Sequence, residues 1–131
     1  MKKHYLYFLL LSTFLIISCK KEEIPSIVGT WELSRETGGF TGQTKDFPIG
    51  NGIIIKFSSD TYQRYENNQL LSSGTYKLMK ENSLITREVG NRLIFDNSTN
   101  SPRIFTTVSN SRLELFLDAY DGGGVSYRKS E

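Results

Sequence analysis

The stretch Ile27-Val28-Gly29-Thr30-Trp31-Glu32-Leu33-Ser34 decides the fold. Polar and apolar residues alternate along it, which places Ile27, Trp31 and Leu33 on one face of an extended strand. An amphipathic helix would instead group apolar residues three or four positions apart. The stretch therefore predicts a β-strand with one face in a core.

The same period of two continues along the chain and is broken at roughly 8–12-residue intervals by turn-forming residues. No window keeps a helical period beyond about two turns. We therefore expect an all-β domain, a small antiparallel up-and-down β-barrel of about eight strands, because closure removes exposed sheet edges; a sandwich is the alternative. Further strands are expected at residues 53–57, 62–66, 74–79, 83–87, 92–95, 103–108, 113–117 and 125–128.

The N-terminus has the pattern of a secretory signal peptide, with a basic start at residues 1–4 and a largely apolar run at 5–17. This run is too short for a membrane-spanning helix, which needs about 20 residues. Ile16-Ile17-Ser18-Cys19 resembles the lipobox of bacterial lipoproteins, which implies cleavage before Cys19 and its acylation by more than one chain, as stable anchoring requires. We expect a signal peptide at 1–18, a lipidated cysteine and tether at 19–26, and the barrel domain at 27–131.

The tether carries a short charged motif. Lys21-Glu22-Glu23 resembles an export signal that follows the cysteine in surface-displayed lipoproteins of some Gram-negative bacteria. The resemblances imply an outer-membrane lipoprotein with a palmitate-type anchor, exposed at the cell surface. A plain solvated linker explains the same charges, so a periplasmic orientation is the alternative.

Composition argues against most catalytic and nucleic-acid-binding classes. The chain has 16 basic and 14 acidic residues, and loss of Lys2 and Lys3 with the signal peptide makes the two numbers equal. A chain without basic excess is not expected to bind nucleic acid. Loss of His4 and acylation of Cys19 exclude histidine- and thiol-based catalysis and the usual zinc and copper sites. We expect no enzyme and no cofactor.

The acidic residues do not suggest a catalytic pair or a metal site. The candidate carboxylates have no spacing that selects a pair facing a substrate; they are Glu32, Glu114, Asp118 and Asp121. The oxygen-rich loops 96–100 and 118–121 lack the glycine and terminal glutamate of a calcium-binding loop. Turn geometry explains both loops, and no metal is predicted.

Several short motifs resemble those of lipocalins. Gly29-Thr30-Trp31 is similar to their Gly-x-Trp signature, and other features resemble small bacterial lipocalin-like lipoproteins. These features are Phe57-Ser58-Ser59-Asp60-x-Tyr62, Gly74-Thr75-Tyr76, the leucine alternation at 113–117 and Tyr127-Arg128. The resemblance implies that Trp31 closes one end of the barrel, with Arg128 (or Lys129) packed across it. The chain is shorter than full-sized lipocalins and lacks their long C-terminal helix, so we expect a smaller interior.

The leading functional hypothesis is a binding protein that holds a small apolar or amphiphilic ligand inside the barrel. The aromatic candidates for inward positions are Trp31, Phe57, Tyr76 and Phe105, and we assign Phe57 and Tyr76 to the ligand site. If Ser59-Asp60 is a two-residue turn, Phe57 faces Tyr62, and Arg64 faces inward opposite Ile55. An inward Arg64 would bind a carboxylate or phosphate head group. A bulge that reversed the register would instead turn Arg64 to solvent.

The alternative is a non-catalytic interaction module whose barrel is filled by its own side chains. Its partner would be a protein, and its role that of an inhibitor, an immunity protein or a component of a surface complex. The contacts would come from the glycine-containing loops 38–50 and 118–124, because glycines let a loop adapt to a partner.

Overall fold

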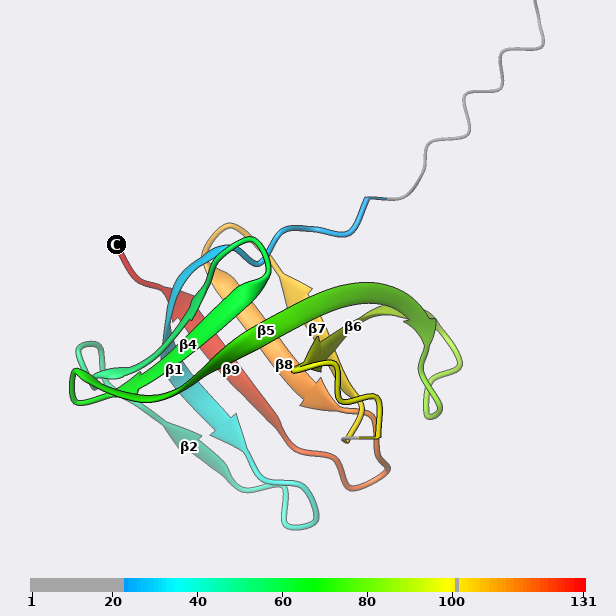
Figure 1. Ribbon diagram of the computed structural model, residues 1–131. Helices are drawn as coiled ribbons and strands as arrows, with labels where there is room; N and C mark the ends of the chain where they lie inside the picture. The colour runs from blue at the N-terminus through cyan, green and yellow to red at the C-terminus, as the bar shows by residue number, and fades with distance from the viewer. Residues whose placement is uncertain (1–22, 101) are drawn as a thin grey trace, which may run out of the picture.

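Nine strands follow one another in the computed structural model, which describes residues 23–100 and 102–131 (Figure 1). Each pairs antiparallel with its neighbour in the sheet, and β9 pairs with β1, so eight strands close a barrel and short β2 lies beside the end of β1. The predicted up-and-down barrel is confirmed. The strands are β1 (Gly29–Thr37), β2 (Thr44–Asp46), β3 (Ile53–Phe57), β4 (Thr61–Glu66), β5 (Gln69–Asn82), β6 (Val89–Phe95), β7 (Ile104–Val108), β8 (Arg112–Leu117) and β9 (Gly124–Lys129).

The predicted signal peptide, Cys19 and the first two residues of the Lys21-Glu22-Glu23 motif lie outside the described residues. In the part of the chain that is described, no helix is long and apolar enough to span a bilayer. The N-terminal segment enters β1 on one side of the barrel, and the β1–β2 hairpin and the β8–β9 turn lie on the opposite side (Figure 1).

The turn between β3 and β4 fixes which residues face the interior. Ser58 N–H donates to the carbonyl of Thr61 at 2.9 Å, and Phe57 pairs with Tyr62. Ile55 therefore pairs with Arg64, as the two-residue turn predicted. Because the side chains of directly paired residues share a face, Arg64 lies on the interior side of the sheet.

Aromatic side chains fill the interior next to Trp31, which is 2% exposed. The rings of Phe57 and Tyr76 meet edge to face with centroids 4.9 Å apart. The indole N–H of Trp31 donates to the carbonyl of Ile27 at 2.8 Å, and Lys129 Nζ lies 5.9 Å above the indole ring. Ile27 and Trp31 thus close this end of the barrel, with Lys129 packed across the indole.

Arg128, which the lipocalin resemblance also offered for that position, lies on the other face of β9. Its Nε is 3.4 Å from Glu32, and its Nη2 donates to the carbonyls of Leu33 at 3.1 Å and Phe47 at 2.5 Å. Arg128 therefore ties the segment after β2 to the outer face of β1. Since Trp31 pairs with Lys129 and Glu32 with Arg128, the register of β1 with β9 gives the position on Trp31 to Lys129.

A second buried layer covers the outer face of β6 and β7, and here two expectations were wrong. Phe105 does not face inward: it alternates with the interior residue Ile104, and its ring stacks on Phe116 at 6.1 Å. Gly90 lies against the Phe105 ring, where a Cβ would clash. Residues 83–87 form a turn rather than a strand, with Arg87 at φ 65°.

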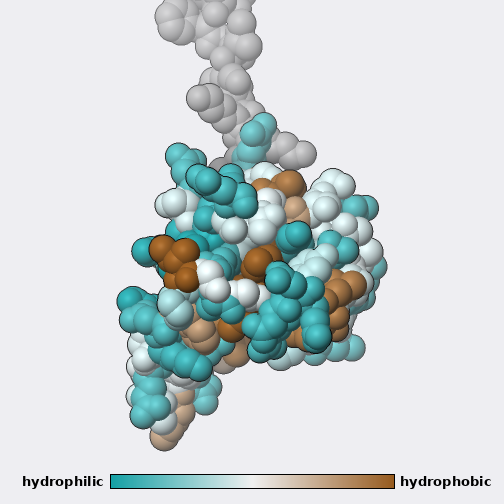
Figure 2. Space-filling view, turned by 90° about the vertical axis from the view of Figure 1, so that its left-hand side faces the viewer, coloured by the Kyte–Doolittle hydropathy of each residue, from teal (hydrophilic) through white to brown (hydrophobic). Residues whose placement is uncertain are grey.

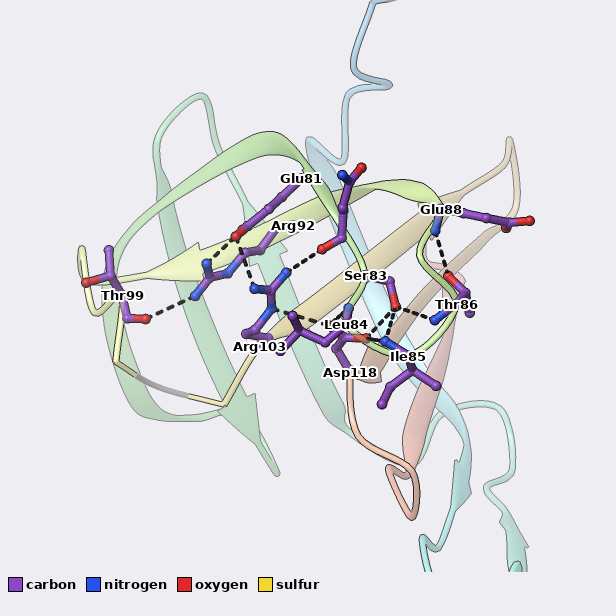
Figure 3. A network of polar contacts seen from close by, with 11 residues as sticks. Glu81, Ser83, Leu84, Ile85, Thr86, Glu88, Arg92, Thr99, Arg103 and Asp118 are labelled. Atoms are coloured by element: carbon purple, nitrogen blue, oxygen red, sulfur yellow. Dashed lines mark hydrogen bonds and ion pairs between the residues drawn. The ribbon is translucent and has the colours of Figure 1, made fainter.

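An ion-pair network holds that turn in place (Figure 3). The carboxylate of Asp118 accepts from Ser83 Oγ at 2.5 Å and from the backbone N–H of Leu84 at 2.8 Å. Arg103 lies 3.2 Å from Asp118 and 3.1 Å from Glu81, which in turn pairs with Arg92 at 2.7 Å. The network therefore joins the turn at residues 83–88 to the end of β5, the middle of β6, the residue before β7 and the residue after β8.

Candidate functional site

A cavity of about 690 Å³ opens at the end of the barrel away from Trp31. The β1–β2 hairpin and the β8–β9 turn form its rim, and β4, β6, β7, β8 and β9 contribute wall residues. The two rim segments contact each other. Gly39 of the hairpin lies so close to the backbone carbonyl of Asp121 in the β8–β9 turn that a Cβ atom at position 39 would clash with it. Figure 2 shows the uneven outline of one face of the molecule, with a narrow projection at the lower left and hydrophobic side chains in separate patches.

The wall of this cavity is largely apolar. Its main side chains are Phe95, Ile104, Leu115, Val125 and Tyr127. All five are core residues or pack directly against the core, so the cavity is an unfilled continuation of the hydrophobic interior. A filled barrel, which the alternative hypothesis expected, is therefore not what the described residues form at this end.

Arg64 brings a positive charge to the apolar wall. Its guanidinium carbon lies 4.9 Å from the ring centroid of Phe95 and 5.4 Å from that of Tyr62. Among residues 23–100 and 102–131, no carboxylate lies within ion-pair distance of Arg64. The side chain remains water-accessible through the open end, which avoids the cost of burying an unpaired charge.

Tyr127 adds a hydroxyl to the same wall. Burial raises the pKa of this phenol, while the charge of Arg64 acts in the opposite direction and Glu36 raises the pKa further. The hydroxyl therefore stays protonated at neutral pH and can both donate and accept a hydrogen bond. Arg64 and Tyr127 line the same cavity.

The structure places the other two predicted ligand residues elsewhere. Phe57 and Tyr76 lie on the interior face, but in the packed aromatic cluster rather than in the cavity wall. The Tyr76 hydroxyl donates to the carbonyl of Ser58 at 2.6 Å, and its side chain borders a separate hollow of about 420 Å³ beside residues 24–28. Of the three predicted ligand residues, only Arg64 lines the main cavity.

The chain matches no family model, no curated protein and no solved structure. In the described ranges, no group of three or more His, Cys, Asp or Glu side chains could hold a metal ion.

The cavity residues of the later strands were not predicted from the sequence, although the alternation of apolar and polar residues would have identified them. Phe95, Ile104, Val125 and Tyr127 all occupy the inward positions of their alternating stretches. Chemically, the cavity offers an apolar wall with the guanidinium of Arg64 and the phenol of Tyr127 at its side, and Lys45 and Glu36 also line it, with one charge of each sign. This arrangement suits a molecule with an apolar body and a single anionic group.

Proposed function

We propose that this protein is a lipocalin-like, lipid-anchored envelope protein that binds an anionic amphiphile in the open end of its barrel. One observation carries the proposal: Arg64 lines an apolar cavity and has no carboxylate partner in the described part of the chain. The protein acts as a non-catalytic carrier or receptor for that ligand.

The size and chemistry of the cavity support this function. A volume of about 690 Å³ lies within the range of roughly 300–1,000 Å³ typical of small-molecule sites. The ligand's carboxylate or phosphate binds the guanidinium of Arg64 through charge-assisted hydrogen bonds. Its apolar body lies along Ile104, Leu115 and Val125, away from water.

Arg64→Ala is expected to weaken binding of a fluorescent fatty acid by about tenfold or more, because a hydrogen bond to a charged group contributes roughly 1.5–3 kcal/mol. A neutral analogue of the same length should lose much less affinity. Fluorescence titration of the wild type and the variant with both probes gives the comparison. Arg112→Ala is the matched control, because this exposed arginine has only a 3.8 Å pair with Glu114 and does not line the cavity.

Two outcomes would contradict parts of this proposal. No saturable binding of either probe to the wild type would remove the carrier function. Equal loss of affinity for the charged and the neutral probe in Arg64→Ala would leave the cavity as the site but remove the head-group role of Arg64.

The lipid anchor is proposed from the lipobox-like motif at Cys19. Cys19→Ala is expected to abolish incorporation of a palmitate analogue and to release the protein from membranes, because no second anchoring signal is predicted. Metabolic labelling and membrane fractionation measure both effects. Labelling and membrane association equal to the wild type would contradict the anchor. Replacing Lys21-Glu22-Glu23 by alanines tests surface exposure separately, through accessibility to external protease.

The alternative, a protein-interaction module, is favoured by two exposed aromatic side chains. Phe40 is 93% exposed in the β1–β2 hairpin, and Tyr120 is 92% exposed in the β8–β9 turn that packs against it. Aromatic residues are enriched where proteins bind one another. If the cavity is the functional site, replacing both Phe40 and Tyr120 by serine should leave fatty-acid binding unchanged.

A further inference from the structure

One edge of the sheet is left without a partner strand. Residues 69–74 of β5 pair with β4, but the ladder between β5 and β6 begins only at Tyr76. Thr75, between these two parts of β5, bonds to Asp96 instead of to a strand. The Oδ1 atom of Asp96 accepts from the N–H of Thr75 at 2.9 Å, and the backbone N–H of Asp96 donates to the Thr75 carbonyl at 2.8 Å. Among the described residues, the first half of β5 is therefore a free edge of six residues, which we call the β5 edge (residues 69–74).

The backbone geometry shows which groups point outward from the β5 edge. Both backbone groups of Thr75 point away from β4, towards Asp96. Residues two positions apart in an antiparallel strand point to the same neighbour, so those of Ser73 also face outward. The bulge opposite Arg64 and Tyr65 shifts this alternation by one residue, so Leu70 is the next residue with outward N–H and C=O groups.

The side chains of the β5 edge do not protect it from pairing. Natural edge strands commonly carry charged residues or proline that discourage another strand from docking. The β5 edge, Gln69-Leu70-Leu71-Ser72-Ser73-Gly74, has neither, and Leu70 and Leu71 are 52% and 61% exposed. In contrast, the short edge strand β2 carries Lys45 and Asp46.

We propose that the β5 edge pairs antiparallel with the β5 edge of a second copy of this chain, forming a two-fold symmetric dimer. In the register that we propose, Leu70 lies opposite Ser73 of the second copy, and Leu71 lies opposite Ser72 of the second copy. Each leucine meets a small side chain, and no like charges are opposed, so the edge is complementary to itself. Leu70 and Ser73, whose backbone groups point outward, become the hydrogen-bonded pairs on both sides of the two-fold axis.

The same geometry explains why the interface ends where it does. Asp96 occupies the side of Thr75, so a second strand can pair with β5 only as far as Gly74. In the proposed register Gly74 faces Gln69 of the second copy, which is the first residue of β5. The symmetric ladder therefore uses the six residues of the free edge and ends beside Asp96, whose carboxylate lies against Gly74.

The register can be tested by disulfide formation between two differently tagged full-length chains expressed together. Leu71→Cys in one chain and Ser72→Cys in the other should form a disulfide, because residues 71 and 72 are directly opposite and outside the hydrogen-bonded pairs, with Cα atoms about 4.5 Å apart. Pairs of identical variants should cross-link less, since neither residue faces itself. Two tagged wild-type chains measure the background from Cys19.

A charge on the β5 edge supplies the second measurement. Adding Leu70→Lys to both cysteine variants should lower the mixed disulfide at least about tenfold, because two ammonium groups would lie at the interface. Leu84→Lys is the matched control: Leu84 is also half exposed but lies in the 83–88 turn. The proposal is overturned by an absent mixed disulfide, by equal cross-linking of identical variants, by a yield that Leu70→Lys leaves unchanged, or by capture of a different protein at these cysteines. Ligand binding does not enter any of these readouts.

Discussion

Replacing Trp31 by alanine is expected to lower the free energy of unfolding by about 3–5 kcal/mol, the usual cost of deleting a large buried aromatic side chain. Trp31 is 2% exposed, and its indole N–H bonds to the carbonyl of Ile27. The substitution leaves a cavity at the closed end of the barrel and removes the surface on which Lys129 lies. A domain of this size has a total stability of roughly 5–15 kcal/mol, so the melting temperature should fall sharply. Urea and thermal denaturation followed by circular dichroism give the measurement.

Two further variants separate the loss of buried apolar volume from the loss of the hydrogen bond and from the removal of an aromatic side chain in general. Trp31→Phe keeps most of the apolar volume but loses the hydrogen bond, so we expect a smaller loss than for alanine. Tyr120→Ala removes another large aromatic side chain, but one that is 92% exposed, and should change stability little. If Trp31→Ala unfolded at the same urea concentration as the wild type, Trp31 would not be the residue that closes the barrel.

The fold was predictable because the information for it is local. Alternation of polar and apolar residues identifies the strands, and turn chemistry divides them. The two-residue turn at Ser59-Asp60 was enough to predict the pairing of Ile55 with Arg64. Likewise, Asn67 and Asn68, at φ 49° and 63°, form the two-residue turn that their residue types suggest.

The errors come from contacts between distant parts of the chain. Residues 83–87 have the composition of a strand, but Ser83 Oγ and the carboxylate of Asp118 bind the backbone N–H groups that a strand would use. Asp118 lies 34 residues beyond Leu84, so no local pattern reveals this competition. Tertiary hydrogen bonds override strand propensity here.

The candidate site was predicted only in part, because a period of two gives the face of a residue but not its depth along the barrel. Phe57 and Tyr76 are inward, as expected, yet they lie in the packed cluster beyond the cavity. Depth depends on strand stagger, which is a property of the whole closed sheet. The position of Lys129 over Trp31 likewise depends on the register between the first and last strands.

Asp118→Asn is the second substitution with a large expected effect, a loss of about 3 kcal/mol of unfolding free energy at neutral pH. The Asp118 side chain is 2% exposed and lies 3.2 Å from Arg103, which is itself largely buried. Breaking this buried ion pair is costly, because Arg103 and Arg92 are left to share the single carboxylate of Glu81. The amide also brings an N–H₂ group towards Ser83 and Leu84, where donors already converge. The 83–88 turn should become more exchangeable, as amide hydrogen exchange would show.

The pH dependence of this effect tests its electrostatic origin. Burial acts to raise the pKa of Asp118, but hydrogen bonds from Ser83, Leu84 and Ile85 and the charge of Arg103 outweigh it, so the pKa is lowered in the folded protein. A lowered folded-state pKa stabilises the fold above the unfolded pKa of about 3.9, and this stabilisation is lost as the pH falls through the folded value. The stability difference between wild type and Asp118→Asn should therefore be constant from neutral pH down to about 5 and shrink below about 4. Asp121→Asn is the control: Asp121 is exposed in the β8–β9 turn, three residues after Asp118, and its replacement should show no such difference in stability. A difference between wild type and Asp118→Asn that persisted unchanged in strong acid would mean that shape, rather than the ionised carboxylate, holds the 83–88 turn.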